Sequence, residues 1–185
     1  MKRIRLFFLA GILLLTASVW LQAQNNSLLE YNTELNQINR VSMSVLSGWA
    51  VLNFIGFGTA SFFTRGQLQS FCQMNALWNV VNMAIAFPAL YQSLVFDPAN
   101  YDLSQSITAH FNLEKAFLLN TGLDVAYIVT GFLLMEISNR SSLSNPGQLK
   151  GFGQGLILQG GFLIVFDLVM YFIHANHFNQ LKALL

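Results

Sequence analysis

The chain has 185 residues, of which 54% are hydrophobic and only 9% are charged. Soluble domains carry about a quarter charged residues, so this composition argues against a soluble protein and is typical of an integral membrane protein. The formal net charge of +1 gives no indication of a nucleic-acid partner. Cys72 is the only cysteine in the sequence, which excludes an internal disulfide and a cysteine-pair redox relay.

The first 23 residues have the layout of a secretory signal peptide. The basic stretch MKRIR is followed by the apolar run LFFLAGILLLTASVW and then by LQAQ. In that last stretch, Ala23 offers the small residue that signal peptidase needs before a cleavage site at Gln24. We therefore predict a signal peptide over residues 1–23. The alternative is a retained signal anchor that adds one helix.

Residues 24–41 are predicted to form an amphipathic segment. Leu28, Tyr31, Leu35 and Ile38 recur at helical spacing. Such a face either continues into the first membrane span or lies on the outer leaflet of the bilayer. We favour a helical extension of the first span over an arm that binds a partner.

Four long apolar segments follow, and none shows the period-two alternation of a β-strand. They cover residues 42–63, 71–95, 113–137 and 152–174, each 22 to 25 residues long. At 1.5 Å per residue, each is long enough to cross a hydrocarbon core of about 30 Å. We therefore predict an all-α, four-helix transmembrane bundle over residues 42–185, with the lipid bilayer as its main partner.

The charges of the connecting loops predict the orientation of the bundle. The first and third loops carry Arg65, Arg140 and Lys150 and no acidic residue, whereas the second loop carries Asp97 and Asp102. Basic loops stay on the cytoplasmic side. The N-terminus and the C-terminus are therefore predicted to be periplasmic, in a bacterial cytoplasmic (inner) membrane. A signal peptide requires the same orientation.

A short internal repeat predicts that the bundle consists of two tandem helical hairpins. GQLQSFCQ from Gly66 and GQLKGFGQ from Gly147 share five of eight residues. Each stretch stands at the start of the second span of a hairpin. Two such hairpins would insert the same way up, related by a pseudo-two-fold axis along the membrane normal. The alternative is a chance match.

On helical wheels, every predicted span carries its polar residues on one face. Lipid cannot satisfy these groups, so we expect the four faces to meet inside the bundle. They would form a polar core that is open to the periplasm. The residues predicted to bind a ligand or a proton there are Asp124, Asp167, Asn53, Asn82, Asn120, Tyr127 and Gln159.

The two carboxyl groups, Asp124 and Asp167, are the strongest functional candidates in this core. An Asp at a helix centre costs about 2.5–3.5 kcal/mol on insertion scales. Neither residue has a Lys or Arg at its depth, so we expect one or both to be protonated. The surrounding amides would then serve either as structural hydrogen-bonding groups or as part of a site for a proton, a cation or a small polar ligand.

A second candidate site lies at the predicted periplasmic rim. His110 and Glu114 are four residues apart, and His174 and His177 are three apart, so each pair shares one helix face. Two histidines with a carboxylate are suitable ligands for zinc or non-haem iron. Haem held by His110 and His174 is a weaker alternative. A third reading gives these rim residues only a structural role, in which they cap helix ends.

The stretches HFNLEKAFLLNTGLD (residues 110–124), LKGFGQGLILQGGFLIVFD (residues 149–167) and the QAQ end of the signal peptide resemble small uncharacterised four-span membrane proteins of Bacteroidetes. The resemblance extends over nearly the whole mature chain. It implies a four-span membrane protein and carries no activity.

Three functions are compatible with the sequence. The first is a membrane protein whose polar core binds or conducts a proton, a cation or a small polar ligand. The second is a metal-dependent membrane enzyme that uses the rim cluster, with Glu114 or Asp167 as the base. The third is a non-catalytic membrane subunit or scaffold whose polar faces only specify helix pairing. A homo-oligomer and a larger membrane complex are both compatible with the same residues.

Overall fold

The computed structural model describes residues 2–140 and 144–182, with side chains described in these ranges from residue 26 onward. In that part of the chain there are four α-helices and one 3₁₀ turn, and no β-strand. The elements are α1 (Lys2–Phe63), α2 (Gly66–Val95), η1 (Pro98–Asn100), α3 (Leu103–Ser138) and α4 (Pro146–Lys182). The all-α prediction is confirmed, whereas the predicted signal peptide over residues 1–23 lies outside the described side chains.

The turns between helices follow from local sequence. Gly66 has a φ of +63°, a conformation that suits glycine, and it lets the chain reverse between α1 and α2. Asp102 caps α3 by accepting a hydrogen bond from the backbone N–H of Gln105 at 2.8 Å, while the Gln105 side chain accepts from the Asp102 N–H. Pro146 opens α4, a position at which its missing N–H has no consequence.

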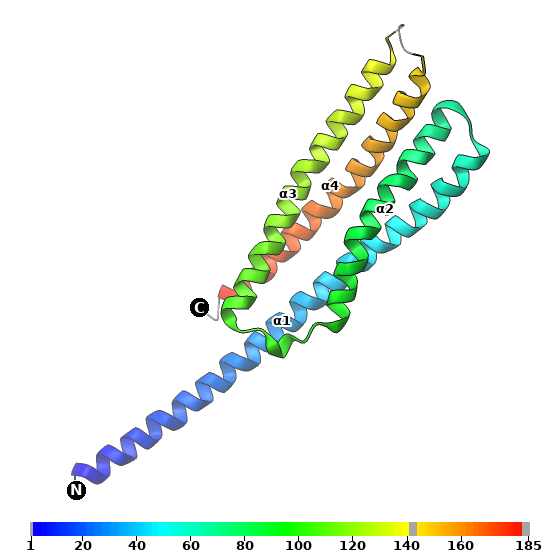
Figure 1. Cartoon of the computed structure of the whole chain (residues 1–185). Coiled ribbons are helices and arrows are strands. Elements are labelled where there is room, and N and C mark those ends of the chain that lie inside the picture. The colour runs from blue at the N-terminus through cyan, green and yellow to red at the C-terminus, as the bar shows by residue number, and fades with distance from the viewer. Residues whose placement is uncertain (1, 141–143, 183–185) are drawn as a thin grey trace.

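The helices form two antiparallel pairs, with α1 packed on α2 and α3 packed on α4 (Figure 1). The two pairs meet chiefly through α2 and α4, which run in the same direction. Gln67 near the start of α2 donates to Gln154 near the start of α4 at 2.9 Å, and Gln159 donates to Asn75 further along at 2.6 Å. We call the end of the bundle crossed by η1, between α2 and α3, the linker end.

Three helices are long and apolar enough to cross a membrane, namely α1 over Asn26–Phe63 and α3 and α4 over their whole lengths. Helix α2 carries Asn75, Asn79 and Asn82, which lower its mean hydropathy, and all three are buried inside the bundle. Membrane localisation is therefore well supported by three helices, and the crossing by α2 stays a prediction.

Helix α4 approaches two neighbours closely because glycines face both of them. A Cβ added to Gly131 of α3 would lie 2.6 Å from the Gly153 carbonyl oxygen, and one added to Gly153 would lie 2.5 Å from the Gly131 oxygen. On the α2 side, a Cβ on Gly151 would overlap the Gln67 carbonyl, and one on Gly155 would lie 2.9 Å from Met74 Cβ. Small residues are what allow membrane helices to pack at such distances.

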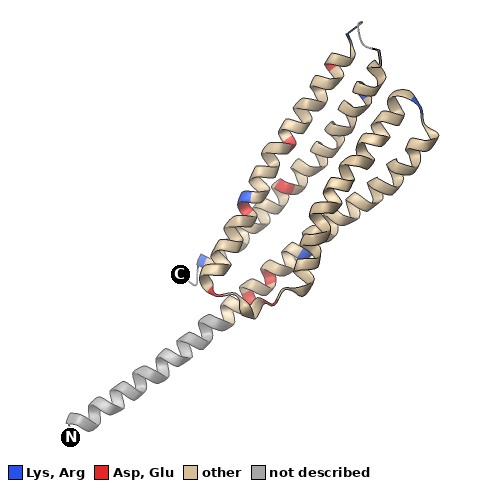
Figure 2. Ribbon diagram, in the orientation of Figure 1, with Lys and Arg blue, Asp and Glu red and all other residues tan. Residues whose placement is uncertain are grey.

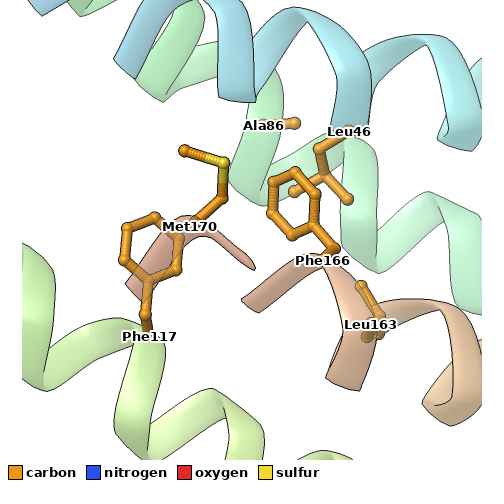
Figure 3. Packing of buried hydrophobic residues seen from close by; sticks show 6 residues of the cluster. All are labelled: Leu46, Ala86, Phe117, Leu163, Phe166 and Met170. Atoms are coloured by element: carbon orange, nitrogen blue, oxygen red, sulfur yellow. The ribbon is translucent and has the colours of Figure 1, made fainter. Parts of the chain in front are cut away.

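One apolar cluster joins all four helices in the interior (Figure 3). We call it the apolar layer. Leu46 comes from α1, Ala86 from α2 and Phe117 from α3, and α4 supplies the rest. Its buried members are Leu46, Ala86, Phe117, Leu163, Phe166 and Met170.

A second, smaller cluster of Tyr31, Leu35 and Leu181 lies at the linker end. The apolar face predicted for residues 24–41 thus packs on the bundle through Tyr31 and Leu35.

We expect Gly131→Ala to lower the free energy of unfolding by about 1–3 kcal/mol, because the new methyl group collides with the backbone of α4. The matched control is Gly122→Ala on the same helix, where an added Cβ meets nothing within 4 Å. Unfolding in mixed detergent micelles, followed by circular dichroism, measures both variants. Equal stability of the two variants would contradict the close contact of α3 with α4.

Candidate functional site

Asp124 of α3 and Asp167 of α4 come together inside the bundle, and we call them the carboxyl pair. They are only 2% and 4% exposed, and their side chains lie next to one another. Gly160 brings the two helices together here, since a Cβ at that position would lie 3.0 Å from the Asp124 carbonyl oxygen. Two carboxylates side by side in the interior repel one another, so we expect the pair to hold at least one proton.

The carboxyl pair has no basic counterion in the described part of the chain. The close contacts of carboxylates with basic side chains found there join His110 to Glu114 and His177 to Glu34, at the linker end. Figure 2 shows acidic positions in the middle of α3 and α4, while most basic positions lie towards the ends of the bundle and one lies beside an acidic position on α3. In addition, Asp124 Oδ2 is buried without a hydrogen-bond partner among the described residues.

A second polar cluster, which we call the amide network, lies on the α2 side of α4. Gln159 donates to Asn75 Oδ1 at 2.6 Å and accepts from Trp49 Nε1 at 3.1 Å. Along α2, Asn79 donates to the Asn75 carbonyl and Asn82 donates to Asn79 Oδ1. These contacts join α1, α2 and α4 through hydrogen bonds that lipid could not provide.

The predicted site residues therefore divide between two places. Asp124 and Asp167 form the carboxyl pair, and Asn82 and Gln159 belong to the amide network. Asn53, Asn120 and Tyr127 join neither cluster. Asn53 donates to the Trp49 carbonyl of its own helix, Tyr127 packs edge-on against Trp78, and Asn120 makes no hydrogen bond within the described residues.

Asn75, Asn79 and Trp49 were not among the predicted site residues, although they are part of the amide network. The signal for them is in the sequence, because each lies on the same helical face as a predicted residue. What the helical wheel cannot supply is the register between α2 and α4, which pairs Asn75 with Gln159.

The rim residues form a hydrogen-bonded chain that includes Tyr31. His110 Nε2 lies 3.1 Å from Glu114 Oε1, and His110 Nδ1 lies 2.7 Å from the Tyr31 hydroxyl. Because the carboxylate accepts from Nε2–H, Nδ1 is left to accept from the tyrosine. Tyr31 also stacks on His177 with ring centroids 4.4 Å apart. This chain ties α1 to both α3 and α4 at the linker end.

His174 lies in the same region but has a different environment. It is completely buried, and neither ring nitrogen has a hydrogen-bond partner. It stacks on Phe117 at 5.3 Å, and its ring centroid is 6.2 Å from that of His110. Among the described residues, no three His, Cys, Asp or Glu side chains are grouped as a metal ion requires. A metal held by His110, Glu114, His174 and His177 therefore stays a prediction.

The apolar layer separates the rim from the carboxyl pair. On α3, Phe117 stands between Glu114 and Asp124, and on α4, Met170 stands between Asp167 and His174. Both are buried, and both belong to the cluster that also contains Leu46 and Ala86 from the other pair of helices (Figure 3). The polar groups of the bundle thus occur in two zones with a packed hydrocarbon layer between them.

Residues 45–168 match the model of a protein family described as a family of unknown function, DUF6992. No curated protein and no solved structure matches the chain. The matched range contains the carboxyl pair and the whole amide network, whereas Tyr31, His174 and His177 lie outside it.

We expect Gln159→Leu to lower the free energy of unfolding by about 1–2 kcal/mol, because it leaves Asn75 Oδ1 and Trp49 Nε1 buried without a partner. Gln73→Leu is the control, since Gln73 is exposed and makes no hydrogen bond within the described residues. Unfolding in detergent gives the free energy of unfolding of both variants. If Gln159→Leu is as stable as Gln73→Leu, the amide network has no structural role.

Proposed function

The chain belongs to the DUF6992 family of unknown function, and we propose that it is a membrane protein that binds or conducts a proton or a cation at the carboxyl pair. The observation that carries this proposal is the burial of Asp124 beside Asp167 in the interior, without a basic partner among the described residues. Ionisable residues within membrane helices are expensive and mostly functional.

The chemistry of the pair suits small cationic species. A singly protonated pair carries one negative charge, which a second proton or a cation can neutralise without ever placing two negative charges side by side. Asp124 Oδ2 has no hydrogen-bond partner and supplies an oxygen to a proton or a hard cation. Asn53, Asn82 and Asn120 would orient the bound species in the state that opens to water.

The proposed topology has four spans. Large apolar side chains cover the exposed face of α2, including Leu77, Val81 and Ile85, as a lipid-facing helix requires. A signal peptide over residues 1–23 and the positions of the basic loops support periplasmic termini in the inner membrane of a bacterium, in keeping with the Bacteroidetes resemblance.

The proposed duplication into two hairpins also has support. A pseudo-two-fold axis along the membrane normal requires equivalent helices to run in the same direction, and α2 and α4 do so at the centre of the bundle. The repeated Gly-Gln-Leu stretches stand at equivalent ends of these helices, beginning at Gly66 and Gly147. Asp124 and Asp167 would then mark the second hairpin as the specialised half.

For protein reconstituted in liposomes, we expect Asp124→Asn and Asp167→Asn each to abolish the uptake of protons or cations, because an amide cannot release a proton or carry the charge. A pH-sensitive dye inside the vesicles, and a matching dye for alkali cations, measure the flux. Asp97→Asn, an exposed linker position, is the control. If both core variants transport like the unaltered protein, the carboxyl pair is not the site of transport.

His174 favours a second candidate function, the metal-dependent membrane enzyme. Its two buried nitrogens have no hydrogen-bond partner, which is unusual for a structural histidine and leaves both able to bind a metal. His110, Glu114 and His177 would have to give up hydrogen bonds to complete the ligand set. In this case, Glu114 or Asp167 would act as the base.

For protein purified without chelator or polyhistidine tag, elemental analysis tests this second candidate. A metal enzyme would contain about one zinc, iron or manganese per chain, and His174→Ala would lose it. An absorption spectrum separates haem from non-haem iron. The absence of stoichiometric metal, with no change in His174→Ala, would leave the carboxyl pair as the remaining candidate.

A further inference from the structure

A cavity of about 350 Å³ lies at the linker end, between the α1–α2 pair and α3. It is lined by residues of α1 from Asn32 to Met43, of α2 from Ala89 to Ser93 and of α3 from Ala109 to Leu113, together with Phe96 just after α2 and Tyr101 after η1. None of the residues of the carboxyl pair or the amide network lines it. Its size is at the lower end of the range for small-molecule sites.

The polar groups that line the cavity are side-chain amides and hydroxyls, without a charged group among them. The amides come from three helices and are Asn32, Asn36, Asn39, Gln92 and Asn112. Arg40 is close by but does not line the cavity, and its guanidinium donates to the Ser93 carbonyl at 3.0 Å. A charged ligand would therefore enter without a counterion, which makes an uncharged ligand the better fit.

The hydrogen bonds already present show what such a ligand must offer. Asn32 donates to the Pro98 and Tyr101 carbonyls, and Asn36 donates to the Ser93 carbonyl at 3.0 Å, so both amide oxygens are left to accept. Asn39 and Asn112 make no hydrogen bond within the described residues, so each can both donate and accept. Hydroxyl groups match this wall because they also do both, whereas a ligand with acceptors alone would leave amide oxygens unpaired.

The rest of the wall is hydrocarbon. Leu35, Met43, Phe96 and Leu113 line the cavity beside the amides. Met43 and Leu113 also pack against the apolar layer, so this side of the cavity leads towards the interior of the bundle. A hydroxylated head group alone would leave these side chains without an apolar partner.

The predicted spans over residues 42–63, 71–95 and 113–137 place the cavity at the level of a membrane surface. Exposed apolar side chains such as Val41 and Leu94 reach this level, and the exposed charged residues Arg40 and Asp97 lie beside them. Lipid head groups and the first part of their chains occupy this zone of a bilayer.

We propose that the linker-end cavity binds an uncharged, hydroxyl-rich lipid head group of the glycolipid type, together with the start of its hydrocarbon chain. The amides of Asn39 and Asn112 hydrogen-bond its hydroxyl groups from opposite walls, and Met43 and Leu113 contact the chain.

The test uses the full chain in phosphatidylcholine nanodiscs with a dodecyl glucoside that carries a photoreactive diazirine on its chain. Peptide mass spectrometry should find adducts in residues 35–43, 89–96 and 109–113. Asn39→Leu and Asn112→Leu should each lower this labelling about fivefold, which corresponds to a hydrogen bond of about 1 kcal/mol. Neither variant removes a hydrogen bond within the described structure, and Gln37→Leu, an exposed neighbour outside the lining, is the control.

Three results would overturn the proposal. Unchanged labelling in both leucine variants would remove the site. Equal labelling of the same residues by a diazirine-bearing alkyl phosphocholine would remove the preference for an uncharged, hydroxylated head. Loss of labelling in the presence of excess free glucose would show that a free sugar suffices and that the lipid chain is not recognised.

Discussion

The close approach of α4 to two neighbouring helices is the constraint on which the rest of the interior depends. Glycines at 131, 153 and 160 leave no room for a Cβ between α3 and α4, and Gly151 and Gly155 do the same between α4 and α2. Dispersion contacts are strong only at such short separations, and lipid supplies no hydrophobic force that would hold apolar helices together. Helix α4 is therefore the centre of the bundle, and α1 is attached mainly through α2.

Each of the two close contacts carries its own polar chemistry. On the α3 side, Gly160 brings the backbones close enough for Asp124 to meet Asp167. On the α2 side, Gly155 packs against Met74, one residue from the Asn75 that pairs with Gln159. The amide network is fully provided with partners and specifies how α2 and α4 align. In the carboxyl pair, by contrast, Asp124 Oδ2 is buried without a hydrogen-bond partner. This difference is why the proposed function rests on the two acids.

The apolar layer gives the proposed proton or cation site a closed state. Phe117 and Met170 lie between the carboxyl pair and the polar rim, and they pack with residues from α1 and α2. Access to the acids from the linker end therefore requires the two helix pairs to separate or the aromatic side chains to change rotamer. The linker-end cavity adjoins this layer, since Met43 and Leu113 line the cavity and also pack against the layer. An occupant of the cavity would thus be positioned to influence how the pairs meet.

Composition and periodicity by themselves determined the class of the protein, its helical architecture and the identity of several interior polar residues. These properties depend on single helices, because length sets whether a segment crosses a membrane and the 3.6-residue period sets which residues share a face. Asp124, Asp167, Asn82 and Gln159 could be chosen for this reason.

Only the tertiary structure decided which of these residues meet. The register between α2 and α4 pairs Asn75 with Gln159, and the contact of α1 with α3 makes Tyr31 the partner of His110. A helical wheel has no information on register or on which helices are neighbours. Both are set by where glycines permit close contact between segments far apart in the sequence, and the cavity at the linker end is the space that this packing leaves unfilled.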